Sequence, residues 1–165
     1  MPITPLHLGL GASCKALGNR KFSFLIFAGT QVLIDLEPLL GIILGWKTLH
    51  LYTHNLIGAF FIGIIAIIIG KPMSEIILRT IDQESKRYIT WKVAAFSAFI
   101  GSFSHILLDA FMHADMYPFF PLSKSQILLG LIPYSYIFYG CLIGFIIGGV
   151  AFLIRELLTT PSKFS

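Results

Sequence analysis

Charged residues are scarce in this chain. Asp, Glu, Lys and Arg make up 12% of its 165 residues, while hydrophobic residues make up 56%. An ordinary soluble domain has about a quarter charged residues. This composition excludes a soluble globular domain and favours a membrane protein. The length allows four or five membrane helices and no separate soluble domain, so we expect residues 1–165 to form a single membrane-embedded helical domain.

Features of several other protein classes are also absent. The N-terminus has no basic segment followed by a cleavage site, so we expect no removable signal peptide. Cys14 and Cys141 lie in separate apolar segments, which favours packing roles over a disulfide or a thiolate metal site. No Ser-His-Asp arrangement or glycine-rich phosphate loop stands out. The basic residues follow one side of the membrane and form no groove, so we expect no nucleic-acid partner.

The hydrophobic runs predict an all-α polytopic membrane bundle of about four transmembrane helices. The expected spans are residues 22–46, 49–70, 91–112 and 134–154. Residues 4–17 reach only ~20 Å as a helix, so we expect a short half-inserted or interfacial N-terminal helix. Pro38 is expected to kink or interrupt the first span. Polar residues 71–92 are expected to form a loop with a short amphipathic helix.

The last span contains a ridge of small residues. Gly140, Gly144 and Gly148 recur every fourth residue, a spacing that allows close helix packing. We expect this ridge to pack within the bundle, and a homo-oligomer formed through it is the alternative.

The distribution of Lys and Arg predicts the orientation of a multi-pass cell-membrane protein. Lys47 and Lys124 lie on one side of the predicted membrane, and the other ten of the twelve lie on the opposite side. The positive side is usually cytoplasmic. We therefore expect the N-terminal turn, the 71–92 loop and the C-terminus in the cytoplasm.

The third span ends in a polar stripe. His105, Asp109 and His113 are spaced i, i+4, i+8, so a helix places them on one face. Such side chains are costly in an apolar medium unless they are paired or bind a metal. His113 lies at the helix end, and we expect it to face water beyond the site.

Polar residues of other segments agree with this stripe in depth. Counted at 1.5 Å per residue from the cytoplasmic boundary, Asp35, His105, His54 and His7 all lie roughly 16–25 Å up. We therefore expect one polar layer in the outer half of the membrane. Nitrogen and oxygen ligands without thiolate suit Zn²⁺ best, with Mn²⁺ or Fe²⁺ as alternatives. The ligands exceed what one tetrahedral ion needs, so two or three ions are open alternatives.

Each polar residue also has a purely structural interpretation. His50 and His54 could lie at a wet helix end, since they are spaced i, i+4. Asp35 and Glu37 could cap a helix interrupted at Pro38. Glu37 and Asp115 could orient histidines without binding the ion.

Four short motifs contain these polar residues. They are Pro5-Leu6-His7-Leu8-Gly9, Val32-Leu33-Ile34-Asp35-Leu36-Glu37-Pro38, Leu49-His50 with Thr53-His54-Asn55, and Ser104-His105 through Asp109 followed by Asp115-Met116-Tyr117-Pro118. Together they resemble the YdjM-like family of predicted membrane-bound metal-dependent hydrolases. The family is distantly similar to the helical zinc phospholipases C and single-strand nucleases. This sequence departs from the family pattern at Leu51, where many relatives have Arg, and at Glu37, where many have Asp.

The resemblance implies a set of site residues. Metal ligands would be His7, Asp35, His50, His54, His105 and Asp109, with ligation or support from Glu37 and Asp115. The expected function is hydrolysis of a phosphoester in a membrane lipid or another amphiphile, through a metal-activated water with Asp109 or Glu37 as base. The alternatives are a metal-ion or proton transporter that uses the same layer and a non-catalytic structural protein with a metal site.

Overall fold

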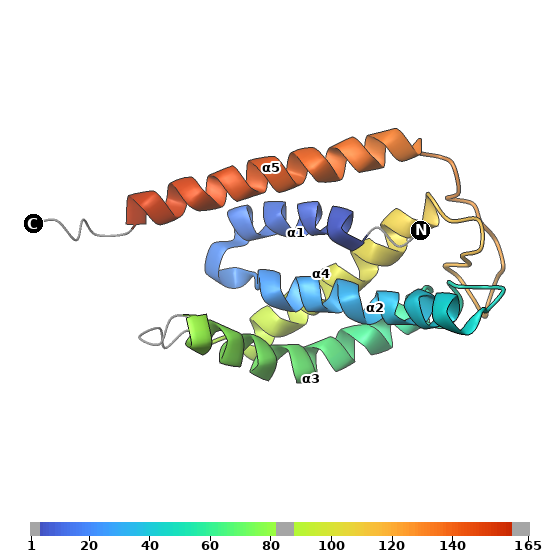
Figure 1. Ribbon diagram of the computed structural model, residues 1–165, viewed down its shortest axis with the longest axis horizontal. Coiled ribbons are helices and arrows are strands. Elements are labelled where there is room, and N and C mark those ends of the chain that lie inside the picture. Colours follow the sequence, from blue (N-terminus) through green and yellow to red (C-terminus); the bar gives the residue numbers. More distant parts are fainter. Residues whose placement is uncertain (1–3, 82–87, 160–165) are drawn as a thin grey trace, which may run out of the picture.

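The computed structural model describes residues 4–81 and 88–159, and every regular element within them is helical. Helices α2 to α5 are long and apolar enough to cross a membrane. The prediction of a helical membrane bundle is therefore confirmed (Figure 1). The elements are α1 (Thr4–Gly18), a 3-10 turn η1 (Asn19–Lys21), α2 (Phe24–Leu44), α3 (Leu56–Ile81), α4 (Trp91–Ala110) and α5 (Tyr134–Thr159).

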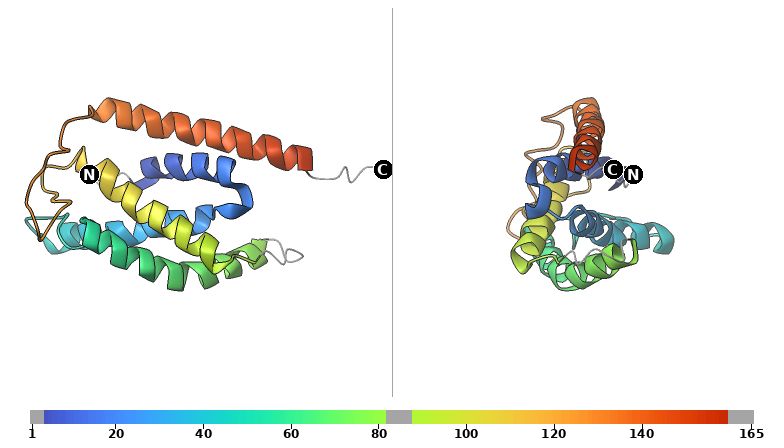
Figure 2. Two further views of the ribbon diagram at one scale, coloured as in Figure 1. Left: turned by 180° about the vertical axis from the view of Figure 1, so that it is seen from behind. Right: turned by 90° about the vertical axis from the view of Figure 1, so that its left-hand side faces the viewer.

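The helices pack as two groups joined through α1. Helices α2, α3 and α4 contact one another, and α4 runs obliquely to the others (Figures 1 and 2). Helix α1 packs against α2 on one side and α5 on the other. The short helix α1 is therefore enclosed by longer helices, which explains how a segment of this length can lie within a membrane bundle.

Small residues bring α2, α3 and α4 close together. Ala59, Ala66, Ala94 and Ala98 are fully buried in two apolar clusters that join the three helices. A Cβ atom on Gly63 of α3 would lie 2.7 Å from the Phe99 ring of α4. Lipid tails are as apolar as the side chains they contact, so the hydrophobic effect does not drive membrane helices together. Close packing of this kind stabilises their association instead.

The glycine ridge of α5 packs on α1. A Cβ atom on Gly148 would lie 2.5 Å from the Ala12 carbonyl carbon, and the Ser13 hydroxyl donates a 3.0 Å hydrogen bond to the Gly144 carbonyl. No atom lies within 4 Å of a Cβ built on Gly140. Two of the three ridge glycines thus contact α1, and a homo-oligomer formed through the ridge stays a prediction.

Substitution of Gly9 by alanine is expected to separate α1 from α5. A Cβ atom there would lie 1.8 Å from the Cys141 carbonyl oxygen, a backbone atom that cannot rotate away. Overpacking of this kind costs typically about 1–3 kcal/mol, which thermal unfolding in detergent would detect. Gly140→Ala is the matched control, since its Cβ meets nothing within 4 Å. Equal unfolding temperatures for the two variants would contradict this packing.

The sequence predicted a kink or an interruption at Pro38. Helix α2 is not interrupted there. It continues to Leu44 and ends at Gly45, whose φ of 70° and ψ of 34° are left-handed. Proline cannot donate to the carbonyl four residues earlier, that of Ile34. The Thr53 hydroxyl lies 3.0 Å from the Ile34 oxygen and replaces the missing donor. A side chain from the following loop therefore keeps the helix continuous.

Helix α3 begins and ends later than predicted. Residues 49–55, expected as the first turns of the second span, form an irregular segment before Leu56, and the helix then continues past Gly70 to Ile81. Residues 82–87, where a short amphipathic helix was expected to continue, lie outside the described residues. Lys71, near the end of this longer helix, is buried because it pairs with Glu75 at 2.8 Å and lies over the Tyr88 and Trp91 rings.

Two long connections meet at one end of the bundle. The segments 45–55 and 111–133 lie together beside the start of α1, and the α1–α2 turn lies at the opposite end (Figure 1). The Leu56 amide donates to the Pro118 carbonyl oxygen at 2.9 Å and links the two connections. His50 and His54 lie in the first connection and His113 in the second, while His7 lies near the start of α1 and His105 in the last turns of α4.

Candidate metal centre

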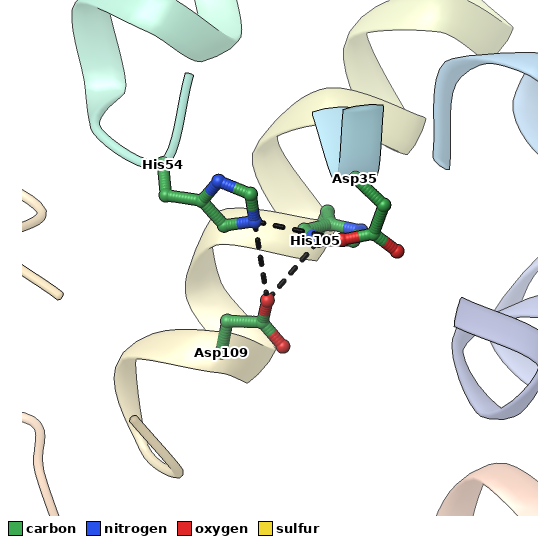
Figure 3. Close-up of side chains that lie close together, drawn as sticks. All are labelled: Asp35, His54, His105 and Asp109. Atoms are coloured by element: carbon green, nitrogen blue, oxygen red, sulfur yellow. Dashed lines mark ion pairs between the residues drawn. The ribbon is translucent and has the colours of Figure 1, made fainter. Parts of the chain in front are cut away.

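Four buried side chains from three elements converge between α2 and α4. Asp35 comes from α2, His54 from the segment before α3, and His105 and Asp109 from α4 (Figure 3). One potential ligand atom from each lies within 4.8 Å of the others. The i, i+4 spacing of His105 and Asp109 supplies half of this cluster from one helix face.

The imidazole nitrogens of this cluster face carboxylate oxygens. His105 Nε2 lies 3.1 Å from Asp109 Oδ2 and 3.3 Å from Asp35 Oδ1. His54 Nε2 lies 3.7 Å and 3.6 Å from the same two oxygens. Neither Nε2 atom has a hydrogen bond, although both are buried. Buried polar atoms are nearly always bonded, so two such nitrogens beside two carboxylates indicate a ligand site.

Gln31 determines the tautomer of His105. Its side-chain amide donates a 2.9 Å hydrogen bond to the Gly101 carbonyl, which turns Gln31 Oε1 towards His105 Nδ1 at 2.7 Å. An amide oxygen only accepts, so Nδ1 carries the proton and Nε2 has a free lone pair. Gln31 was not predicted as a site residue, although it lies one helical turn before Asp35 on the same face of an apolar span.

Thr53 and Glu37 orient His54 in the same way. His54 Nδ1 lies 3.0 Å from the Thr53 hydroxyl and 3.6 Å from Glu37 Oε2. The one proton of the Thr53 hydroxyl has two acceptors, the Ile34 carbonyl oxygen at 3.0 Å and Glu37 Oε2 at 2.6 Å, so the hydroxyl oxygen accepts from His54 Nδ1. His54 Nε2 is then the lone-pair nitrogen. Partners of this kind fix the tautomer and orientation of metal-binding histidines.

Glu37 also folds the segment that carries His54. Its carboxylate accepts hydrogen bonds from the amides of Leu51, Tyr52 and Thr53 at 3.3, 2.7 and 2.6 Å. A Cβ atom on Gly58 would lie 2.2 Å from the Tyr52 carbonyl oxygen, so this segment rests directly on the first turn of α3. The oxygens of Glu37 are directed at this segment and not at the ligand nitrogens, a geometry that supports a positioning role.

His50 and His113 lie beside the four-residue cluster, towards the loops. Their rings stack with centroids 4.5 Å apart, and His113 Nε2 lies 3.8 Å from Asp109 Oδ1. His113 was expected beyond the site, and the structure corrects this. Phe111 keeps a helical conformation, and the His113 amide donates to the Asp109 carbonyl at 2.9 Å, so the helical spacing holds the ring beside Asp109. Burial lowers the pKa of His113, which keeps the ring neutral.

Asp115 holds His50 in place. His50 Nδ1 lies 2.9 Å and 3.0 Å from the two Asp115 oxygens, and the Leu49 amide donates to the same carboxylate. Burial raises the pKa of Asp115, but the hydrogen bond and charge interaction with His50 outweigh it and hold the pKa below its usual range. The ionised carboxylate therefore accepts from Nδ1 and leaves His50 Nε2 as a lone-pair nitrogen.

His7 differs from the other histidines. Its Nδ1 lies 3.3 Å from His105 Nδ1, whose proton is donated to Gln31, so a proton on His7 Nδ1 would face another N–H group. The neutral ring therefore carries its one proton on Nε2. His7 Nε2 faces Asp109 Oδ1 at 3.4 Å. Metal ligation by His7 would require that proton to leave and stays a prediction.

The predicted site residues thus lie in one region of the structure. Asp35, His54, His105 and Asp109 form its buried centre, and the other predicted residues surround that centre: His7, Glu37, His50 and Asp115. The buried donors are imidazole and carboxylate, the ligand types that suit Zn²⁺, Mn²⁺ and Fe²⁺. The four central residues therefore fit a divalent metal ion, and the roles of individual residues stay predictions.

Comparison with known proteins identifies one family. The family model described as YdjM inner membrane protein matches residues 7–160 of this chain. This match covers every residue of the candidate metal centre. Comparisons with curated proteins and with solved structures gave no match.

Proposed function

This chain belongs to the YdjM inner membrane protein family, and from that premise we propose that it is a membrane-bound metal-dependent hydrolase. Its substrate would be a lipid or another amphiphile with a phosphoester bond. The resident cation would be Zn²⁺, with Mn²⁺ or Fe²⁺ as alternatives. One observation carries the proposal: the buried, unbonded Nε2 atoms of His54 and His105 face the carboxylates of Asp35 and Asp109.

These four residues would hold the cation with their deprotonated atoms. The two tautomers established by Gln31 and by the Thr53–Glu37 pair present lone pairs at Nε2, so no proton has to leave a histidine before the cation binds. A bound divalent cation would act as a Lewis acid and lower the pKa of a water molecule. The surrounding residues would keep the ligands oriented and exclude bulk water.

Acid–base chemistry would fall to Asp109 and to residues around the four ligands. A general base needs a lone pair directed at the attacking water. The oxygens of Glu37 accept hydrogen bonds from residues 51–53, whereas Asp109 faces the cluster, so Asp109 is the better placed of the two predicted bases. His7 would hold a proton at Nε2, 3.4 Å from Asp109, where it could be passed to a leaving oxygen.

An amphiphilic substrate fits the surroundings of His54. An apolar groove of about 330 Å³ lies between the start of α3 and the 111–133 connection, lined by residues including Thr53, Asn55, Phe61 and Phe120. Thr53 and Asn55 flank His54 in the chain, and we propose that an acyl chain binds in this groove. Leu51 stands where many relatives have an Arg that would clamp a phosphate, so the polar end of the substrate would rely on the cation itself.

The orientation proposal follows from the basic residues. With ten of the twelve Lys and Arg residues cytoplasmic, the 45–55 and 111–133 connections would lie outside the membrane on the far side. The metal centre would then open towards the outer half of the bilayer, where substrate lipids of the outer leaflet could reach it.

The test is turnover by the purified chain in lipid nanodiscs. Zn²⁺-loaded protein is expected to hydrolyse short-chain phosphodiester lipids, to lose activity with a chelator and to regain it with Zn²⁺. His54→Ala should abolish turnover, and Lys124→Ala, an exposed change on the 111–133 connection, should not. Flux of Zn²⁺ or protons across proteoliposomes without ester cleavage would overturn the hydrolase proposal in favour of a transporter. Bound Zn²⁺ with neither activity would favour a structural site.

A further inference from the structure

A second group of potential ligands lies next to the four-residue cluster. One ligand atom each from His50, Asp109 and His113 lie within 4.8 Å of one another. We propose that these three residues form a second cation position, the outer position, which shares Asp109 with the buried position formed by Asp35, His54, His105 and Asp109. This inference rests on the proposed metal-dependent function and adds His113 to the residues that carry it.

The two oxygens of Asp109 point to different histidines. Oδ2 lies 3.1 Å from His105 Nε2 and 3.7 Å from His54 Nε2. Oδ1 lies 3.8 Å from His113 Nε2 and 3.4 Å from His7 Nε2. Two-metal sites hold their ions about 3.5–4 Å apart, a distance that one carboxylate can bridge.

A carboxylate beside His50 supports the outer position. His50 contributes a lone pair at Nε2, because Asp115 engages its Nδ1 at 2.9 Å. This carboxylate–histidine arrangement is the one that orients histidine ligands in known metal sites.

Exposure and ligand number give the two positions different roles. The buried position has four protein ligands, and its histidines are fully buried. The outer position has three, and the His113 and Asp115 side chains at its edge are 15% and 40% exposed. Structural zinc sites are closed by four protein ligands, whereas catalytic sites keep three and leave one place open. The outer position is therefore the more open of the two, with a place left for water or substrate beside its cation.

Metal stoichiometry tests the second position. Full-length protein in detergent, loaded with Zn²⁺ and desalted, is expected to retain two ions per chain by elemental analysis. His113→Ala should retain one, since the buried position loses no ligand, and His113→Gln should behave likewise. Lys124→Ala, exposed on the same connection, should retain two. Thermal unfolding of the zinc-loaded variants verifies that each is folded.

Electron paramagnetic resonance can distinguish two neighbouring ions from a single ion. Protein loaded with Mn²⁺ should give the electron paramagnetic resonance spectrum of an exchange-coupled pair, and His113→Ala should give that of an isolated ion. One ion in the wild type that persists in His113→Ala would overturn the second position and leave the proposed function standing. No bound ion in the wild type would overturn both.

Discussion

Asp109→Asn is expected to remove bound metal from both positions at once. The substitution keeps the shape of the side chain and removes the charge that faces His105 and His54 through Oδ2 and His113 and His7 through Oδ1. Loss of a residue that merely supports a ligand costs 10–100-fold in metal affinity. Loss of a shared ligand should exceed about 100-fold, and elemental analysis of the purified variant would measure it.

Glu75→Gln is the matched control for this change. Glu75 is also a carboxylate in an apolar helix, but it pairs with Lys71 at 2.8 Å and accepts from the Ile89 amide at the other end of the bundle. The Glu75→Gln substitution should lower the stability of the protein without changing its metal content. Retention of full metal content by Asp109→Asn would remove the central residue from the proposed centre.

Glu37→Gln is expected to weaken metal binding indirectly. The ionised carboxylate accepts from the amides of Leu51, Tyr52 and Thr53, and hydrogen bonds to charged groups contribute about 1.5–3 kcal/mol each. Without the charge, residues 51–53 should exchange amide hydrogens faster, and His54 should lose its fixed orientation. We expect metal affinity to fall about 10–100-fold.

Two measurements on this variant separate positioning from proton transfer. A general base at Glu37 predicts lost turnover with unchanged metal affinity and unchanged amide exchange in residues 51–53. A positioning role predicts a change in both, and turnover should recover when excess Zn²⁺ refills the site. Glu75→Gln again serves as control, since it should alter exchange near Ile89 and not near Tyr52.

The spans and the depth of the polar layer could be predicted from the sequence because both follow from simple counting. Apolar runs of about 20 residues predict membrane helices, and a fixed rise per residue gives each polar side chain a depth. Asp35, His54 and His105, which lie far apart in the chain, were expected at similar depths, and the structure brings them together.

The path of the segment before α3 could not be predicted in this way. His50 and His54 have helical spacing, yet residues 49–55 are irregular. Their path depends on Glu37, Asn55 and Asp115, whose hydrogen bonds to backbone groups in this segment replace helical ones. The same segment supplies the Thr53 hydroxyl that keeps α2 continuous through Pro38. The contacts of Glu37, Asp115 and Thr53 join residues distant in the chain, and periodicity reports only local structure.

Gln31 was missed, and His113 was expected beyond the site, for different reasons. A glutamine in an apolar span has no metal-ligand character of its own, and its role depends on contacts with Gly101 and His105 of another helix. His113 was on the predicted polar stripe, but its place at the helix end indicated exposure to water. The backbone keeps a helical hydrogen bond from the His113 amide to the Asp109 carbonyl, so the ring stays beside Asp109.

The enclosure of α1 between α2 and α5 has a consequence for biosynthesis. The chain is made from its N-terminus, and all four ligands of the buried position precede residue 110. Helix α5, whose Gly144 and Gly148 contact α1, is made last. The buried position can therefore assemble while translation continues, whereas the helix that carries His7 reaches its final packing only after the C-terminal span has entered the membrane.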